Sequence, residues 1–522
     1  MGAMPSRRSI SLVSRGLVLG VLFTAACASC GRNSADGAGN ALGNALETQP
    51  ASRSPSDAGP GGGSVVPGAS GCQPLVVQAG AKVDGTSADT FTWYDDQCLP
   101  RTASLFRNDA ADAFQECGGY LRVISYQAAG KTRTLRGTGV DGWQGFGYIV
   151  SHFPGDAVWT RTVTGGYRTV LAGRHHAIHE FKWDISPGGL VHVTVHWMFS
   201  TGRSHPLFAI TLDASATRDG TLQADARAPY GELAWDKGAL GDVSGDGWGD
   251  THKFTTTGNG PVTPTSSWDY TKTNTIPYAY EWSASTDSEM GLVSTLSWAS
   301  RIAGGDYRAG RLTRKWGKTG TNLLTDIPNW EWPFQLNQYE LPSVTTSHRI
   351  GWGATYGAVG SSSYKAFGQT LGGYPYQSYT VYVVLGTHAP SAVAAQVAAV
   401  EATQGVSIAA TRGDVAIEGP GGPARTDQVR FPQTGFDPVY AAWTVDAASN
   451  AATVTLHAGA ATIANPMFEI RRYTGGAPAT VSYAGRALVA DADYFATVDP
   501  AGHRLWITLN QTVSGSGTLI IN

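Results

Sequence analysis

The chain has 522 residues, of which 66 are Gly and only 15% are charged, and its formal net charge is −3. A chain of this length exceeds one ordinary hydrophobic core, so we expect two or three domains. The weak negative charge, without a basic stripe to neutralise phosphates, argues against a nucleic-acid partner. Thr, Val, aromatic residues and Gly-rich turns prevail over helical periodicities, which predicts an all-β fold.

Residues 1–27 have the features of an export signal. Arginines precede an apolar run, residues 16–26, that is too short to span a bilayer as a stable helix. The run ends at Cys27 in a sequence that resembles a bacterial lipoprotein box, although Thr24 stands where Leu is usual. The resemblance implies lipidation of Cys27, and so an exported bacterial protein that is either anchored to the membrane by this lipid or secreted. Residues 28–71, rich in Gly, Ser, Ala, Asn and Pro, are expected to form a flexible linker.

Three further cysteines, Cys72, Cys98 and Cys117, fall within one segment at the start of the folded part. In an exported protein we expect a disulfide between two of them, and the sequence leaves the pairing open. No Cys and His spacing typical of a metal site occurs in the folded part. These cysteines therefore favour a structural role.

Residues 72–390 consist of short expected strands between turns, which predicts one large β-sandwich of two big sheets. Sheets of this size resemble the supersandwich domains of sugar-processing enzymes. The one convincing helix covers residues 391–401, with Ser391 as its N-cap, in a connecting segment 391–404. Residues 405–522 contain seven expected strands, which fit a small immunoglobulin-like β-sandwich with an accessory role.

Residues 174–200 are expected to form a β-hairpin around a Pro-Gly-Gly turn signal. In the second strand, Val191, Val193, Val195, Trp197 and Phe199 alternate with more polar residues, so one face is apolar. An odd loop keeps the charged residues of the first strand off that face. It pairs Glu180 with His196, Asp184 with His192 and Lys182 with Thr194. The hairpin thus predicts a face lined by histidines and carboxylates.

This face is expected to be an open polar trough for a ligand; the alternative is a solvated outer face. We take Glu180 and His196 as catalytic candidates, together with Glu281 and Glu331, which stand beside Trp residues that can raise a carboxyl pKa. Aromatic, amide and basic side chains in loops are typical of sugar-binding sites. The expected substrate contacts are His176, His192, Arg203, His205, Trp330, Trp332, Tyr339, Tyr374 and Tyr376.

Residues 241–250, GDVSGDGWGD, resemble the calcium loops of the FG-GAP, dockerin and EF-hand families. Alternating oxygen ligands followed by a Gly suit a hard cation. The resemblance implies a structural calcium held by Asp242, Ser244, Asp246 and Asp250 with the carbonyl of Trp248, although Ser244 stands where Asn or Asp is usual. The alternative is a turn with solvated carboxylates.

These features favour an exported carbohydrate-active enzyme that cleaves glycosidic bonds of an extracellular polysaccharide, with glycoside hydrolysis preferred. One alternative is a polysaccharide lyase on a uronic-acid polymer, in which Arg203 or another cation neutralises the uronate and a His or Tyr, for example His196, is the base. The other is a non-catalytic carbohydrate-binding or adhesion lipoprotein.

Overall fold

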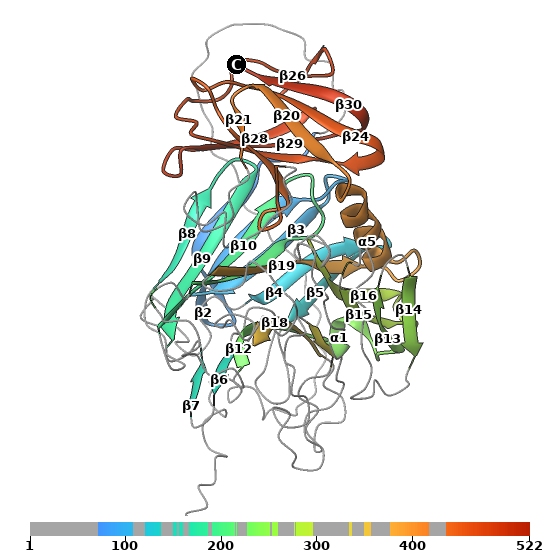
Figure 1. Ribbon diagram of the computed structural model, residues 1–522. Coiled ribbons are helices and arrows are strands. Elements are labelled where there is room, and N and C mark those ends of the chain that lie inside the picture. Colours follow the sequence, from blue (N-terminus) through green and yellow to red (C-terminus); the bar gives the residue numbers. More distant parts are fainter. Residues whose placement is uncertain are drawn as a thin grey trace, which may run out of the picture.

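A computed structural model describes residues 71–107, 121–136, 150–153, 156–159, 166–185, 190–213, 216, 227–250, 253–258, 276, 278–295, 334–336, 349–355, 376–416 and 435–522. The predicted export signal, with Cys27, and residues 28–70 of the predicted linker lie outside these ranges. The all-β prediction is confirmed, because antiparallel sheets dominate the described part (Figure 1). No helix within these ranges is long and apolar enough to cross a bilayer.

The first sheet is an antiparallel meander in chain order. Its strands are β1 (Val76–Val83), β2 (Thr86–Tyr94), β3 (Pro100–Phe106), β4 (Leu121–Ala128) and β5 (Lys131–Arg136). A disulfide joins Cys72 to Cys98 beside it, which confirms the expected bridge between two of the three cysteines. Cys117 lies outside the described residues.

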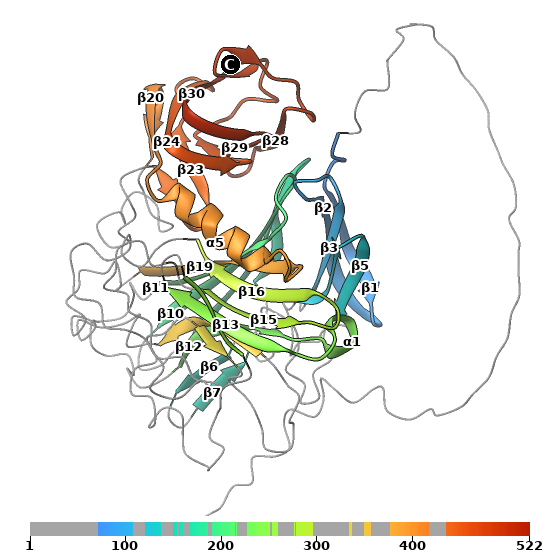
Figure 2. The ribbon, with the colours of Figure 1, turned by 90° about the vertical axis from the view of Figure 1, so that its right-hand side faces the viewer.

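The second sheet has nine antiparallel strands in the order β14-β13-β15-β16-β19-β11-β10-β9-β8. The strands are β8 (Tyr167–Ala172), β9 (His176–Ile185), β10 (Val191–Ser200), β11 (Leu207–Asp213), β13 (Gly245–Asp250), β14 (Lys253–Gly258), β15 (Tyr278–Ser283), β16 (Ser288–Ser294) and β19 (Tyr376–Gly386). Its inner face packs on the first sheet, where the Phe199 ring lies 4.7 Å from Phe91 and 5.0 Å from Trp93. The two sheets form the large sandwich (Figure 2).

A third sheet makes this domain more complex than the two sheets expected. It has the order β17-β18-β12-β6-β7, with β6 (Val150–Phe153), β7 (Asp156–Trp159), β12 (Arg227–Ala234), β17 (Phe334–Leu336) and β18 (Arg349–Thr355). Strand β12 pairs with β6 and β18, which lie far from it in the chain. Alternation identifies such strands but does not identify their partners, so the sequence pattern could not separate this sheet from the others.

The hairpin of β9 and β10 has the predicted register, with Glu180 opposite His196, Lys182 opposite Thr194 and Asp184 opposite His192. The apolar face is buried as expected, since Val193, Val195, Trp197 and Phe199 are at most 2% exposed. Burial of this face fixes the register, because a shift by one residue would place the charged side chains in the core.

Helix α5 (Ala392–Thr403) confirms the expected helix, and the Ser391 hydroxyl caps it by accepting from the Ala394 amide. The other helix of the described part, α1 (Lys237–Leu240), is a single turn. Val393, Val397 and Val400 of α5 are buried, and the helix lies between the nine-stranded sheet and the C-terminal domain (Figure 2).

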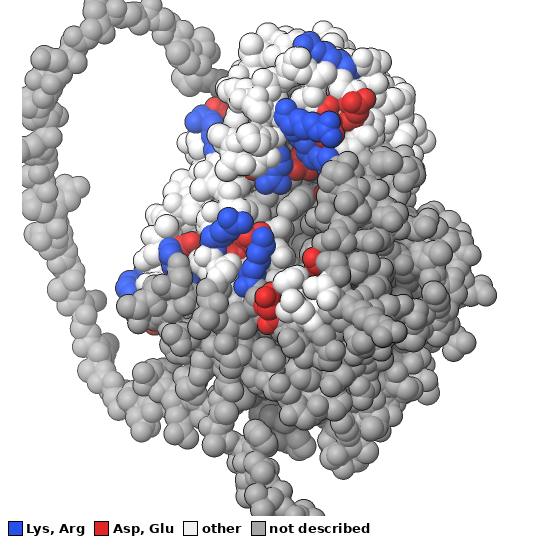
Figure 3. All heavy atoms as spheres, turned by 60° about the vertical axis from the view of Figure 1, so that its left-hand side comes forward, with Lys and Arg blue, Asp and Glu red and all other residues white. Residues whose placement is uncertain are grey.

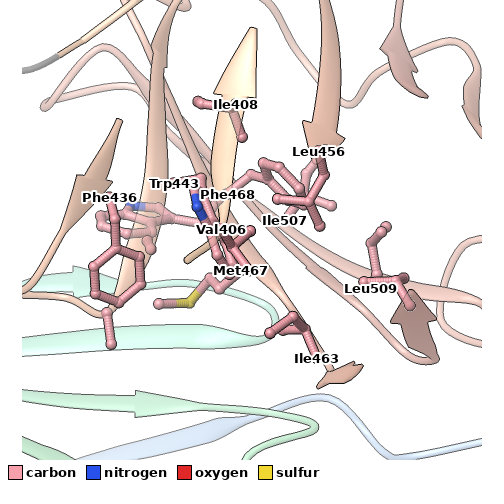
Figure 4. Packing of buried hydrophobic residues seen from close by; sticks show 14 of the residues in the cluster. Val406, Ile408, Phe436, Trp443, Leu456, Ile463, Met467, Phe468, Ile507 and Leu509 are labelled. Carbon is pink, nitrogen blue, oxygen red and sulfur yellow. The ribbon is translucent and has the colours of Figure 1, made fainter. Parts of the chain in front are cut away.

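The C-terminal domain is a small sandwich of two sheets, as predicted. One sheet contains β20 (Ser407–Arg412), β24 (Ala452–Ala464), β30 (Thr512–Ile521), β26 (Val481–Tyr483) and β27 (Arg486–Ala487). The other contains β21 (Asp414–Val415), β23 (Ala442–Asp446), β25 (Met467–Arg471), β29 (Arg504–Leu509) and β28 (Tyr494–Asp499), and β22 (Phe436–Asp437) pairs with β23. Trp443, Leu456, Phe468 and Ile507 fill the core between them (Figure 4).

Candidate functional site

The outer face of the nine-stranded sheet carries the polar trough, which we define as the side chains of Glu180, Lys182, Asp184, His192, Thr194 and His196. Residues paired across antiparallel strands share a face, so the register extends this surface onto both neighbouring strands. Three rows cross it: Arg168–Glu180–His196–Ala209, Lys182–Thr194–Thr211 and Asp184–His192–Asp213. Basic and acidic side chains gather on the large sandwich below the C-terminal domain (Figure 3).

Glu180 is the centre of the first row and is 5% exposed. Its Oε1 accepts from Arg168 Nε at 2.8 Å, and its Oε2 accepts from His196 Nε2 at 2.9 Å. Lys182 Nζ lies 3.2 Å from the same Oε2. Burial alone would raise the pKa of Glu180, but the His196 and Arg168 hydrogen bonds and the charges of His196 and Lys182 outweigh it. The pKa therefore falls to about 2, so Glu180 is an ionised acceptor at neutral pH.

His196 links this carboxylate to the C-terminal sandwich. Its Nδ1 lies 2.9 Å from the Tyr440 hydroxyl, and the two rings are stacked with centroids 5.8 Å apart. With Nε2–H donating to Glu180, Nδ1 is the ring nitrogen that faces the Tyr440 hydroxyl, and it accepts from that hydroxyl whenever the imidazole carries a single proton. Burial raises the pKa of Tyr440, so the phenol is protonated at neutral pH. Sequence reasoning missed Tyr440, which precedes β23.

The far end of the trough is open to solvent. Asp184 Oδ1 lies 2.6 Å from His192 Nδ1, and the two side chains are 61% and 44% exposed. The predicted pairing of these residues is therefore present, in a setting where water screens the charges. His192 remains available to a ligand that enters from this end.

The opposite end of the trough face is covered by the C-terminal sandwich. His176 is fully buried, with Nδ1 3.0 Å from Thr497 Oγ1 and Nε2 2.9 Å from Thr508 Oγ1. Burial lowers the pKa of His176 well below its usual value, so the ring is neutral. The expectation of an open trough is wrong at this end, and His176 has no exposed surface with which to contact a ligand.

Glu281 does not join the site. It pairs with Met290, which pairs with Leu385, and this row lies on the inner face of the sheet. Glu281 is 0% exposed there. The two catalytic candidates Glu180 and Glu281 therefore do not share a site, because their side chains lie on opposite faces of one sheet.

Most of the predicted aromatic contacts cannot be placed. Trp330, Glu331, Trp332, Tyr339 and Tyr374 lie outside the described residues. The backbone of Tyr376 begins β19 and pairs with Asp213, at the open end of the trough.

Arg203 and His205 lie apart from the Glu180 network, on the loop between β10 and β11. Arg203 bonds to the Tyr382 hydroxyl and the Asn465 carbonyl, and both loop residues line a cavity beside α5. They are thus brought to the domain junction rather than to the trough.

The expected calcium segment is partly strand rather than loop. Residues 245–250 form β13, paired on both sides, and alternate residues of a strand lie about 6.7 Å apart along it. Asp242 instead pairs with Lys237 at 2.5 Å, and Ser244 Oγ accepts from the Ala284 amide. The side chains of Asp246, Trp248 and Asp250 lie outside the described set, and within that set no three His, Cys, Asp or Glu side chains are grouped for a metal.

Comparison with known proteins assigns this chain to no family. No protein-family model and no curated protein matches the chain. Among solved structures the chain is similar to a GalM/aldose epimerase homologue from C. elegans, with 10% identity and a TM-score of 0.29. The match covers 57% of this chain and 98% of the other. This likeness identifies neither a substrate nor a site residue here.

Proposed function

We propose that the protein is a polysaccharide lyase that acts on a uronic-acid polymer in the polar trough. The observation that carries the proposal is the hydrogen-bonded chain Glu180–His196–Tyr440, with Arg168 and Lys182 beside it. This arrangement combines a proton relay with cations, which are the two components that elimination next to a carboxylate requires.

The cations favour an acidic sugar. Arg168 and Lys182 both contact one carboxylate, Glu180, so these three side chains carry one excess positive charge, while the carboxylates Asp184 and Asp213 lie toward the open end of the trough. Their side chains are 64% and 49% exposed, which leaves donors for a second carboxylate. A uronate bound there would have its charge neutralised, and the proton on the adjacent C5 would become more acidic.

Tyr440 is the group that exchanges protons with the sugar. Its hydroxyl oxygen takes the C5 proton while its own proton passes to His196 Nδ1, and ionised Glu180 stabilises the resulting imidazolium. The electrons of the C5–H bond form the C4=C5 double bond, and the C4–O4 bond breaks. O4 takes the proton from Tyr440, and His196 then returns a proton to Tyr440. The relay is needed because the raised pKa of Tyr440 leaves almost no phenolate at neutral pH.

Glycoside hydrolysis fits the described trough less well. It requires two carboxyl groups about 5–9.5 Å apart, one of them protonated. Glu180 is ionised, and the next carboxylate of the same strand face, Asp184, begins about 13 Å away at about 3.3 Å per residue. Elimination requires no second carboxylate on the protein.

The deciding experiment is a panel of neutral and uronic-acid polysaccharides, read by new reducing ends and by ultraviolet absorbance of unsaturated uronate. A lyase produces both signals on a uronic-acid polymer. Reducing ends without the absorbance would establish hydrolysis instead. Binding without either signal would establish a non-catalytic carbohydrate-binding protein. Either of these two outcomes would overturn the proposal.

The active polymer then allows a test of the relay. Tyr440→Phe keeps the ring that packs on His196 and Trp506, and it should lower kcat by about 100-fold or more with little change in Tm. Tyr473→Phe is the matched control, because it also removes one hydroxyl hydrogen bond of the C-terminal sandwich, to the Gly476 carbonyl. Full activity of Tyr440→Phe would contradict the mechanism.

A further inference from the structure

The domain junction contains a cavity of about 340 Å³ that is separate from the Glu180–His196–Tyr440 chain. Its walls come from the loop 202–205, one side of α5 and the C-terminal sandwich. A volume of this size is at the lower end of the range for small-molecule sites, and such sites are frequent where domains meet. The cavity therefore suits one small ligand rather than a polymer chain.

Arg203 brings a positive charge to this cavity, and no carboxylate of the described residues forms an ion pair with it. Within the described part of the chain its guanidinium donates to two neutral acceptors, the Tyr382 hydroxyl at 3.4 Å and the Asn465 carbonyl at 3.5 Å. Among the described residues no carboxylate oxygen lies within 4.0 Å of it. A half-buried guanidinium with two long hydrogen bonds retains donors for a planar anion.

The other titratable groups that line the cavity do not neutralise the positive charge of Arg203. Burial lowers the pKa of His205 well below its usual value, so His205 is neutral. Burial raises the pKa of Tyr382, so its phenol is neutral as well. Asp96 lines the cavity, but it is exposed to solvent and accepts from Ser204 at 2.5 Å. Its charge is therefore screened by water more strongly than a buried carboxylate would be.

The remaining wall is apolar. Ala395, Ala399 and Val400 of α5 face the cavity together with Phe436 and Ile463. We propose that this cavity binds a small organic anion, whose carboxylate pairs with Arg203 and whose body lies against α5. Such a ligand would contact both domains and α5 at once, so its binding stabilises the junction.

Calorimetric titration of the full chain tests the proposal with two carboxylates, hexanoate and galacturonate, and with their uncharged counterparts, hexanol and galactose. We expect at least one carboxylate to bind more tightly than its uncharged counterpart and to raise Tm. Preference for hexanoate would identify an aliphatic acid as the ligand class. Preference for galacturonate would identify an acidic sugar, the product class of the proposed lyase.

Two variants assign the binding to the cavity. Arg203→Met removes the charge and keeps the aliphatic stem, and it should weaken carboxylate binding tenfold or more, about 1.4 kcal/mol. Ala395→Leu, at an exposed position of α5, should block the cavity without touching the charge. Arg412→Met, an exposed arginine of β20, is the matched control. Arg203→Met and Ala395→Leu leave the residues of the Glu180–His196–Tyr440 chain unchanged. Loss of ligand binding to the cavity is therefore distinguishable from loss of lyase activity.

The outcomes are decisive in both directions. Loss of binding in both cavity variants, with binding kept in Arg412→Met, supports the site. No binding of either carboxylate at millimolar concentration, equal binding of the uncharged counterparts, or unchanged binding in Ala395→Leu overturns it. Because Ala395→Leu leaves the Arg203 contacts intact, the test holds even if Arg203→Met folds poorly.

Discussion

Replacing Glu180 by Gln should destabilise the large sandwich at neutral pH and leave it unchanged in strong acid. The folded protein lowers the pKa of Glu180 from 4.5 to about 2, although burial works in the other direction. At about 1.4 kcal/mol per tenfold change in proton affinity, the fold favours ionised over protonated Glu180 by about 3 kcal/mol. Gln resembles the protonated form in shape and charge, so Glu180→Gln should lower the free energy of unfolding by up to about 3 kcal/mol at pH 7.

The pH dependence has a definite sign. A carboxyl group whose folded pKa is lowered stabilises the fold above its unfolded pKa, here 4.5, and loses this contribution as the pH falls through about 2. Urea unfolding at a series of pH values should therefore show the two proteins converging between pH 4.5 and 2. This corrects the expectation that the trough is open at Glu180, because its carboxylate is buried among three donors.

Asp184→Asn is the matched control on the same strand. Asp184 and its partner His192 are both largely exposed, so this variant should change the unfolding free energy by less than about 1 kcal/mol. Equal pH profiles for the wild-type protein and Glu180→Gln would refute the argument. A loss for Asp184→Asn as large as that for Glu180→Gln would refute it as well.

Three further expectations follow from other parts of the chain. Val195→Asp should abolish folding of the large sandwich, seen as loss of the cooperative thermal transition, because it buries a charge at a 2% exposed position. If residues 242–250 bind calcium, chelation should lower Tm, and Asp246→Ala should remove most of that difference; identical melting curves would rule the calcium out. If Cys27 is lipidated, Cys27→Ser should move the protein from the membrane to the soluble fraction and abolish palmitate labelling.

Among the elements of the fold, the hairpin of β9 and β10 was predicted most completely from the sequence. Its alternation leaves only one register that keeps Lys182 and Asp184 out of the core, and that register is observed. Helix α5 and its Ser391 cap were predictable for a similar reason, since both depend on neighbouring residues. Local patterns thus identified elements and faces wherever burial of one face was the deciding energy.

Features that depend on distant contacts could not be found this way. Tyr440 is 244 positions from His196, and nothing in its own neighbourhood indicates that its hydroxyl reaches an imidazole. Glu281 was singled out because its neighbour Trp282 could shield it from water. The side chain is indeed buried, but on the inner face of the sheet and not in the trough. The resemblance of residues 241–250 to calcium loops likewise did not indicate that residues 245–250 form a strand. That strand, β13, is paired between β14 and β15.

The role of each residue on the polar face of the hairpin depends on what covers that face. Alternation defines that face but treats His176, Glu180 and Asp184 alike, because all three have the same parity. The C-terminal sandwich distinguishes them: Thr497 and Thr508 enclose His176, Tyr440 reaches only as far as His196, and Asp184 remains in solvent. The C-terminal sandwich was first expected to be accessory. It nevertheless determines which residues of this face make structural contacts and which belong to the candidate site.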